Sequence, residues 1–305
     1  IQKVTEDIVL NTIDFVLTKT SKRSLVYGGG VALNCVLNGK IKQNTICENL
    51  FIQSASGDSG CAAGAALWAY SLSNTKFKNT SNKEFTGPSF ETQEIAASIN
   101  SFNELKAEQF DMEEVFKKTA LFLSKGKVIG WFQGSSEMGP RALGNRSILA
   151  HPGIENMKGI LNLKIKKREG FRPFAPVVLD YAFDDYFVDN QMDYSKMQYT
   201  TQVKSNVNNI PSCVHEDNSA RVQKLVKKEN ERLYELLEEF NRLSGVPLLI
   251  NTSFNERGEP IVCSPEDAIH CFLNTEMDVL VMENFLLLKR ENTKINYSKK
   301  TFELD

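Results

Sequence analysis

One pattern occurs twice near the start of the chain: a short apolar strand runs into a glycine-rich turn and then into a helix. The segment 24–27 (SLVY) precedes the three glycines at 28–30, and 50–52 (LFI) precedes 56–60 (SGDSG). Alternating strands and helices predict a layered α/β unit. Backbone amides at a helix start can bind phosphate, although glycine in such a turn is as often only a steric requirement.

The length of 305 residues is enough for two domains, each with its own core. We place the first at 1–72, a polar linker at 73–111 and the second at 112–305. The second has a mixed order of strands and helices, which predicts an α+β fold or an open twisted sheet. The first residues already follow a helical apolar pattern, so we expect the chain to be part of a longer protein.

Charge and composition exclude several classes of partner. Lys plus Arg number 36 and Asp plus Glu 38, so the chain has no general attraction to nucleic acid or to an anionic membrane. No apolar run reaches the ~20 residues of a membrane helix, and we expect a cytoplasmic protein without a membrane partner. The six cysteines are dispersed without a CxxC pair, which fits a reducing compartment and no zinc motif.

Arginines beside Gly and Pro turns are the main signal in the second half. Arg141 and Arg146 lie in EMGPRALGNRS (137–147), and Arg172 lies in FRPFAP (171–176). Constrained guanidinium groups suit recognition of phosphate or carboxylate, whereas a lone arginine is more often a surface charge. The polar segment 251–255 (NTSFN) follows an expected strand, where ligands of open sheets bind. We therefore expect an anion-binding active site.

Two further side chains are weaker candidates. Asp58 lies at a helix start, where a carboxylate can bind a cation or cap the helix, and capping is favoured because no further ligand is in view. Among the histidines, His270 has apolar helical neighbours that indicate packing, so His215 is the better site candidate.

Several segments, in this order, resemble the O-carbamoyltransferases of the NodU/CmcH family. They are GGGVALN (28–34), GDSG (57–60), EMGPRALGNRSI (137–148), FRPFAP (171–176), ARVQ (220–223), NTSFN (251–255) and GEPIV (258–262). The resemblance covers nearly the whole chain except the linker and the tail. Its most specific parts are the long arginine loop and NTSFN.

The resemblance implies two catalytic domains. The earlier is similar to the second half of an actin/hexokinase-like (ASKHA) α/β fold, and the later looks like a YrdC-like open twisted-sheet domain. In such enzymes the YrdC-like domain joins carbamoyl phosphate and ATP, with Mg²⁺, into carbamoyl-adenylate, and the other domain passes the carbamoyl group to a substrate hydroxyl. The implied partners are thus carbamoyl phosphate, ATP and a hydroxyl-bearing acceptor, with a homodimer as a candidate assembly.

The resemblance also implies residue roles. Lys166 and Arg168 match a Lys-x-Arg signature of YrdC-like domains, and Ser253 and Asn255 match its Ser-x-Asn partner. These residues and the loop arginines would surround ATP or carbamoyl phosphate and stabilise charge during adenylation. The implied catalytic residues are Arg141, Arg146, Lys166, Arg168 and Arg172; the implied nucleotide-binding residues are Gly28, Gly29, Gly30, Asn34, Ser253, Asn255, His215 and Arg221; the implied metal ligand is Asp58.

One departure concerns the metal. The family's metal-binding histidine pair lies in the amino-terminal half of the transferase domain, and this sequence begins after it. We therefore expect a divalent metal such as Fe²⁺ in the full-length enzyme but no tightly bound iron in this chain. Most of the acceptor pocket is expected to be missing for the same reason.

Two other interpretations stay open. A threonylcarbamoyl-type tRNA-modification enzyme would use related domains, although the near-neutral charge and the GPRALGNRS and NTSFN segments count against it. A nucleotide-binding protein without catalytic activity is the second alternative, since a fold alone proves no activity. The intact Lys166, Arg168, Ser253 and Asn255 argue against it.

Overall fold

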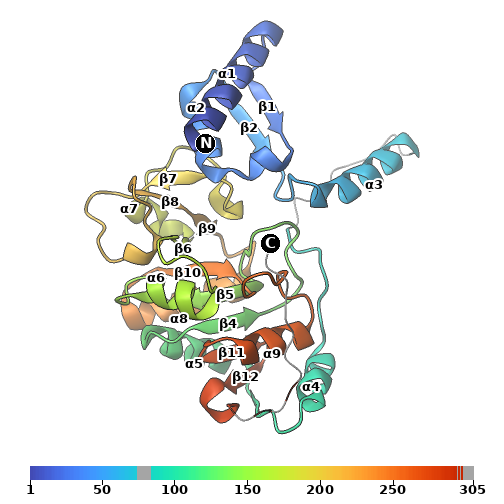
Figure 1. Cartoon of the computed structure of the whole chain (residues 1–305), viewed down its shortest axis with the longest axis vertical. Coiled ribbons are helices and arrows are strands. Elements are labelled where there is room, and N and C mark those ends of the chain that lie inside the picture. The colour runs from blue at the N-terminus through green and yellow to red at the C-terminus, as the bar shows by residue number, and fades with distance from the viewer. Residues whose placement is uncertain (74–83, 294, 296, 298–305) are drawn as a thin grey trace.

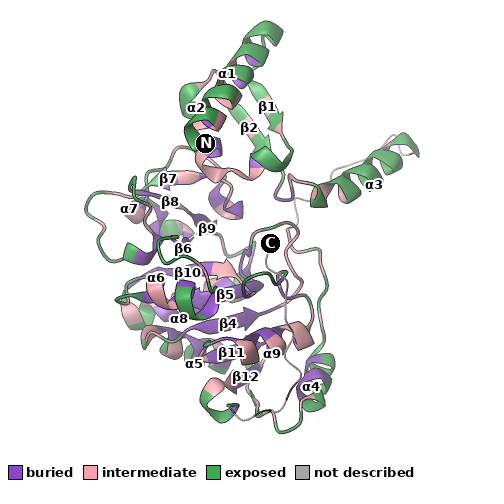
Figure 2. Ribbon diagram, in the orientation of Figure 1, coloured by how far each residue is buried: buried purple, intermediate pink, exposed green. Residues whose placement is uncertain are grey.

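The computed structural model describes residues 1–73, 84–293, 295 and 297. These residues form a small body at the N-terminus and a larger body built around an eight-stranded sheet (Figure 1). The large body carries most of the buried residues, shown in purple in Figure 2. The mixed α/β architecture expected from the sequence is confirmed.

The small body alternates helix and strand. Helix α1 (Gln2–Thr20) precedes β1 (Ser24–Tyr27), and α2 (Cys35–Asn44) precedes β2 (Asn49–Ile52), which pairs with β1 in parallel. The expected alternation is confirmed with one difference, because the glycine turn enters a 3-10 turn, η1 (Gly30–Leu33), and the α-helix begins only after it. The core of this body is small and consists of Ile13, Leu17, Ile41 and Cys47.

Helix α3 (Ser59–Ser73) extends away from both bodies and has no buried residue (Figures 1 and 2). Its exposed side chains include Leu67, Trp68 and Leu72. Within the described residues, no helix is both long enough and apolar enough to cross a membrane.

The large sheet is mixed, with parallel pairs β4–β11 and β6–β9 and otherwise antiparallel pairs. A separate antiparallel pair, β7 (Thr200–Gln202) and β8 (Ser219–Arg221), lies between this sheet and the small body in Figure 1. The strands of the large sheet are, in spatial order, β3 (Glu108–Gln109), β12 (Phe285–Leu288), β11 (Val279–Met282), β4 (Ile129–Phe132), β5 (Arg146–Ala150), β10 (Leu248–Ser253), β6 (Ala175–Leu179) and β9 (Gln223–Leu225).

Three longer helices pack on this sheet, and a fourth packs on one of them. Helices α5 (Met112–Ser124) and α8 (Glu231–Ser244) contact each other. Helix α9 (Pro265–Asn274) contacts β4 and β11, and α4 (Thr92–Ser101) packs against α9. The shorter elements are α6 (Met157–Ile160), the π-helical turn η2 (Leu161–Ile165), η3 (Asp180–Ala182), α7 (Phe183–Tyr186), η4 (Tyr194–Lys196), η5 (Pro211–Cys213) and η6 (Lys289–Glu291).

Helix α8 shows how the sequence pattern gives these helices one buried face. Its buried residues Leu233, Leu236, Leu237 and Phe240 follow helical spacing, so one face of the helix is apolar. The Asn230 side chain accepts a hydrogen bond from the Leu233 amide at the start, and Gly245 ends the helix with a left-handed backbone.

Three expectations about local structure differ from the fold. Part of the expected linker 73–111 forms α4 and β3, which pack on the large body, while the domain bounds themselves stay a prediction. Strand β5 was not expected, because all five of its residues are buried and it therefore lacks the alternation of a half-buried strand. Strand β10 continues through Ser253, so most of NTSFN lies within the strand and not after it.

Gly144 allows the loop before β5 to pass close to α8, which gives a stability prediction. Its φ angle is 112°, and a Cβ there would lie 2.4 Å from Cδ2 of the buried Leu233. We expect Gly144→Ala to lower the free energy of unfolding by about 1–3 kcal/mol, through backbone strain and overpacking. Urea unfolding measures this difference.

Gly170→Ala is the matched control, because its added Cβ meets no atom within 4 Å. Equal unfolding free energies for the Gly144→Ala protein and the parent would show that the loop does not depend on this close approach.

Candidate active site

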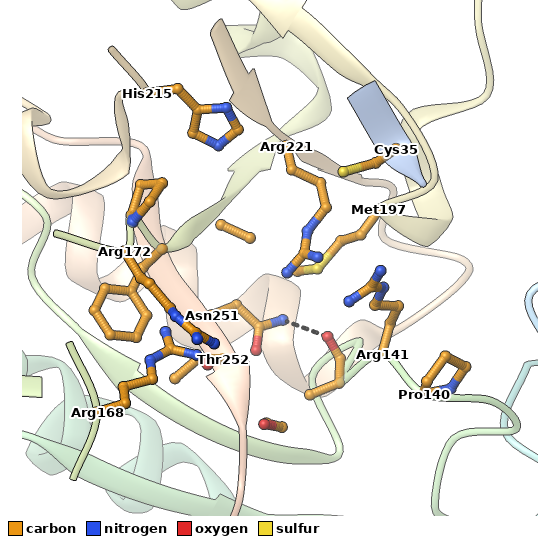
Figure 3. Close-up of a pocket in the computed structure, with 15 residues that line it drawn as sticks. Cys35, Pro140, Arg141, Arg168, Arg172, Met197, His215, Arg221, Asn251 and Thr252 are labelled. Atoms are coloured by element: carbon orange, nitrogen blue, oxygen red, sulfur yellow. Dashed lines mark hydrogen bonds between the residues drawn. The ribbon is translucent and has the colours of Figure 1, made fainter. Parts of the chain in front are cut away.

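A cavity of about 330 Å³ lies where the small body meets the large one, and four arginines point into it (Figure 3). We call it the arginine cavity. No aspartate or glutamate is among its described lining residues, so its electrostatic character is strongly positive. The lining comprises Cys35, Pro140, Arg141, Ala142, Arg168, Arg172, Pro173, Phe174, Ala175, Met197, His215, Arg221, Asn251, Thr252 and Ser253.

The loop between β4 and β5 is organised by Glu137. One oxygen of its carboxylate, Oε1, accepts hydrogen bonds from the backbone amides of Leu143 (2.8 Å), Asn145 (2.7 Å) and Arg146 (3.2 Å). Bonds from amides to an ionised acceptor are stronger than neutral ones. The sequence placed Glu137 in the loop but gave it no role. Its role is to fold the loop back on itself.

Arg141 lies on this loop and reaches the small body. Its Nη2 donates to the Leu33 carbonyl oxygen at 3.0 Å, and Cys35 lines the cavity beside it. Burial, and then repulsion from Arg221, lower the pKa of Arg141 to about 10. The guanidinium therefore stays charged at neutral pH. The small body forms one wall of the arginine cavity.

Arg146 does not line the arginine cavity, contrary to the expectation that it would complete the positive pocket. Its side chain is fully buried, and Nη1 donates to the carbonyl oxygens of Gln133 (2.8 Å), Gly134 (3.1 Å) and Asn145 (3.0 Å). The guanidinium also lies 3.6 Å from the centroid of the Phe132 ring. Because Arg146 opens β5 directly opposite Phe132, its side chain turns into the sheet body.

Lys166 is also buried, and its ammonium group contacts other parts of the protein. Its Nζ donates to the carbonyl oxygen and Oγ of Ser253 and to the carbonyl oxygen and Oδ1 of Asn255. Burial lowers the pKa of Lys166 to about 7. Lys166 therefore joins the end of β10 to the turn that follows η2.

Lys166, Ser253 and Asn255 line a second cavity of about 220 Å³. Arg168, Arg172 and Ser253 line both cavities, so the two adjoin across a shared wall. The Lys-x-Arg and Ser-x-Asn residues are thus brought together, as the sequence predicted, and their contacts with ligand stay a prediction.

Arg168 and Arg172 differ in how firmly they are held. The Nε of Arg168 donates to Asn162 Oδ1 at 2.8 Å, and its guanidinium lies 5.0 Å from the Phe174 ring centroid. Burial, followed by repulsion from Arg172 and Arg221, lowers its pKa. Arg172 is half exposed and pairs with Glu169 at 3.0 Å, a pair that contributes little stability in water.

His215 lies in the turn before β8 and Arg221 ends β8, and both line the cavity. His215 Nδ1 lies 3.0 Å from Ser219 Oγ, and burial lowers its pKa, so the ring is neutral at pH 7. The Nε of Arg221 is buried without a hydrogen-bond partner among the described residues. Both side chains face the cavity in Figure 3.

The expected residues of the small body lie outside the arginine cavity. Gly29 donates its amide to the Ser56 carbonyl at 2.8 Å, and Asn34 accepts from the Leu37 amide as the N-cap of α2. Asp58 is exposed, and within the described residues it belongs to no group of three or more potential metal ligands. These residues alone therefore do not fit a metal site, and nucleotide binding by Gly28, Gly29, Gly30 and Asn34 stays a prediction.

Sequence reasoning missed some lining residues, among them Cys35 and Met197. Asn251 and Thr252 belong to a motif that the sequence had singled out, and their place in a strand beside the arginine loop follows only from the pairing of β10 with β5.

Two family models match the chain. The model described as "Carbamoyltransferase N-terminus" matches residues 1–67, and "Carbamoyltransferase C-terminus" matches residues 120–289. The second match alone covers more than half of the 305 residues.

Curated relatives align with nearly all of this chain. The protein sll1178 of Synechocystis sp. is 41% identical over 100% of this chain and 54% of its own length. Nodulation protein NolNO of Sinorhizobium fredii is 36% identical over 100% of this chain and 45% of its own length. The chain therefore spans about half the length of the curated relatives it matches.

A solved structure of full-length HypF in a phosphate- and nucleotide-bound form aligns with 56% of this chain at a TM-score of 0.43 and 18% identity. A likeness of this size says nothing about function. The two family models decide the assignment: the chain belongs to the carbamoyltransferase family of the NodU/CmcH type, as its motifs predicted.

Proposed function

We propose that this chain holds the carbamoyl-activating site of an ATP-dependent carbamoyltransferase. The enzyme would take the carbamoyl group from carbamoyl phosphate, pass it through carbamoyl-adenylate and deliver it to a hydroxyl of a small molecule or sugar. The observation that carries the proposal is the arginine cavity, which brings four guanidinium groups together without a carboxylate among its lining residues. Such a cavity suits a compact, multiply charged anion.

The two adjoining cavities support a reaction between two anions. Their shared wall of Arg168, Arg172 and Ser253 would lie between a phosphate in one cavity and the phosphates of ATP, with Mg²⁺, in the other. Two anions repel each other in water, and fixed cations between them offset that repulsion and hold the reacting groups close. In balance, carbamoyl phosphate, ATP and one water give carbamoyl-adenylate, pyrophosphate and inorganic phosphate.

Rigid groups would hold this site. Lys166 orders the Ser253–Asn255 segment through its four acceptors, and Glu137 orders the loop that carries Arg141. Preorganised donors stabilise developing charge without having to reorient during the reaction. In this proposal the large body is the YrdC-like activating domain, and the small body is part of the actin/hexokinase-like domain that transfers the carbamoyl group.

The first test is pyrophosphate exchange. We expect the chain to incorporate labelled pyrophosphate into ATP when carbamoyl phosphate and Mg²⁺ are present, because adenylation is reversible while the adenylate stays bound. Bicarbonate plus threonine should not replace carbamoyl phosphate. Exchange that depends on bicarbonate and threonine would favour a threonylcarbamoyl-type enzyme, and nucleotide binding without any exchange would favour a non-catalytic protein.

A second test distinguishes phosphate binding by the cavity arginines from a general effect of surface charge. We expect Arg221→Gln to weaken binding of inorganic phosphate by roughly 10- to 100-fold, because a buried charged donor is lost from the cavity. Calorimetric titration measures the change. Arg242→Gln is the matched control: Arg242 is exposed on α8 and paired with Glu239, so phosphate affinity should stay within about twofold of the parent.

Equal weakening by both substitutions would mean that phosphate responds only to the net charge of the chain, and the assignment of the arginine cavity would then be wrong.

A further inference from the structure

Asn251 lines the arginine cavity and carries one side-chain acceptor without a partner among the described residues. Asn251 lies on β10, is 1% exposed and lines the arginine cavity, where Figure 3 shows it among the arginines. Its Oδ1 is buried and has no hydrogen-bond partner among the described residues. A buried acceptor left unpaired costs about 1–3 kcal/mol, so such an atom calls for an explanation.

The orientation of this amide is fixed by its neighbours. Asn251 Nδ2 donates to Gln223 Oε1 at 2.8 Å and to the Ala142 carbonyl at 3.3 Å, and both of these atoms can only accept. The Gln223 amide is oriented in turn, because its Nε2 donates to the Leu143 carbonyl at 2.8 Å. If the Asn251 amide were flipped, its oxygen would face the oxygens of Gln223 and Ala142, which cannot donate a hydrogen bond. Oδ1 must therefore remain the free atom.

The arginine side chains of the cavity do not satisfy this oxygen, although they supply many donors. A ligand that fits both features combines an anionic group for the guanidinium groups with an N–H or O–H donor a few atoms away. Carbamoyl phosphate has this combination, with a phosphate at one end and an amide NH₂ at the other. Acetyl phosphate has the same shape, but a methyl group replaces the NH₂.

We propose that Asn251 determines specificity by accepting a hydrogen bond from the carbamoyl NH₂ through Oδ1, with Gln223 as the positioning residue that keeps this oxygen turned toward the ligand. The inference rests on the proposed use of carbamoyl phosphate. A site built to accept a hydrogen bond discriminates strongly against an analogue without the donor, because the buried acceptor is then left unpaired.

The test compares two stable probes that differ only at this group. Phosphonoacetamide carries the NH₂, and acetonylphosphonate carries a methyl in its place. We expect the parent chain to bind phosphonoacetamide at least about tenfold more tightly in calorimetric titration, the equivalent of one buried hydrogen bond. In Asn251→Leu, of similar size without the acceptor, the ratio should fall to within about twofold of unity while the affinity for inorganic phosphate stays close to that of the parent.

A double variant controls for the unpaired acceptor that the single substitution leaves in the protein interior. Asn251→Leu alone leaves Gln223 Oε1 unpaired, and Gln223→Met combined with Asn251→Leu removes that amide as well. The double variant should fold and show the same loss of discrimination. Gln223→Met alone should reduce discrimination only in part, because Asn251 Nδ2 keeps its bond to the Ala142 carbonyl.

The outcomes separate this inference from the proposed function. If the parent prefers phosphonoacetamide and a folded Asn251→Leu protein keeps that preference, Asn251 does not read the NH₂ and the inference is wrong, while the proposed function stands. If the parent binds inorganic phosphate but gains nothing from the NH₂, the inference is likewise overturned. If it binds neither phosphate nor either probe, the proposed function fails and the inference fails with it.

Discussion

The bonds from three backbone amides to one oxygen of Glu137 are the contacts on which the cavity depends. They close the loop between β4 and β5, and that loop then sets two arginines in opposite directions. Arg141, in the middle of the loop, faces the cavity, and Arg146, at its end, is drawn into the sheet by carbonyl oxygens and the Phe132 ring. Without the carboxylate, buried amides would lack partners, a cost that exceeds the value of the bonds themselves.

The same loop ties the two bodies together. Arg141 donates to the Leu33 carbonyl, and Gly139 passes so close to the small body that a Cβ there would lie 2.9 Å from the Ser54 carbonyl oxygen. Glu84 adds a buried connection, since it pairs with Lys196 at 2.7 Å and accepts from Ser54 Oγ. The small body has little core of its own, so these contacts fix both its position and one wall of the cavity.

The sequence predicted segments well and side-chain directions less well. The alternation of strand, glycine turn and helix located β1 and β2, and residue types located the loops that line the cavity. Arg141 and Arg146 look equivalent in sequence, since each follows a constrained glycine turn. Their difference comes from the pairing of β4 with β5, which sets Arg146 opposite Phe132, and long-range register of this kind is not visible in one sequence.

Lys166 and Asn251 show the same limit. The motif correctly associated Lys166 with Ser253 and Asn255, but a motif does not reveal that all four acceptors are supplied by the protein itself. The sequence placed Asn251 after the strand with the rest of NTSFN and gave it no individual role, whereas β10 carries it into the buried sheet. Its unpaired oxygen depends on hydrogen bonds that link Asn251 to Gln223, and Gln223 to the Leu143 carbonyl, all distant in sequence.

The charge of the arginine cavity links its structure to the chemistry proposed for it. Arg141, Arg168 and Arg221 are close enough that their mutual repulsion helps to lower the pKa of the first two, yet Arg141 at about 10 remains protonated near neutral pH. The arginine cavity therefore contains positive charges that repel each other, and Arg141 does not lose its charge by deprotonation at neutral pH. Without an anion this repulsion raises the free energy of the folded chain, and a bound anion removes it. Glu169 pairs with Arg172 from outside the arginine cavity, and no carboxylate is among the described lining residues. The loop held by Glu137 thus maintains a positive charge that, in the proposed function, the phosphate of the ligand would neutralise.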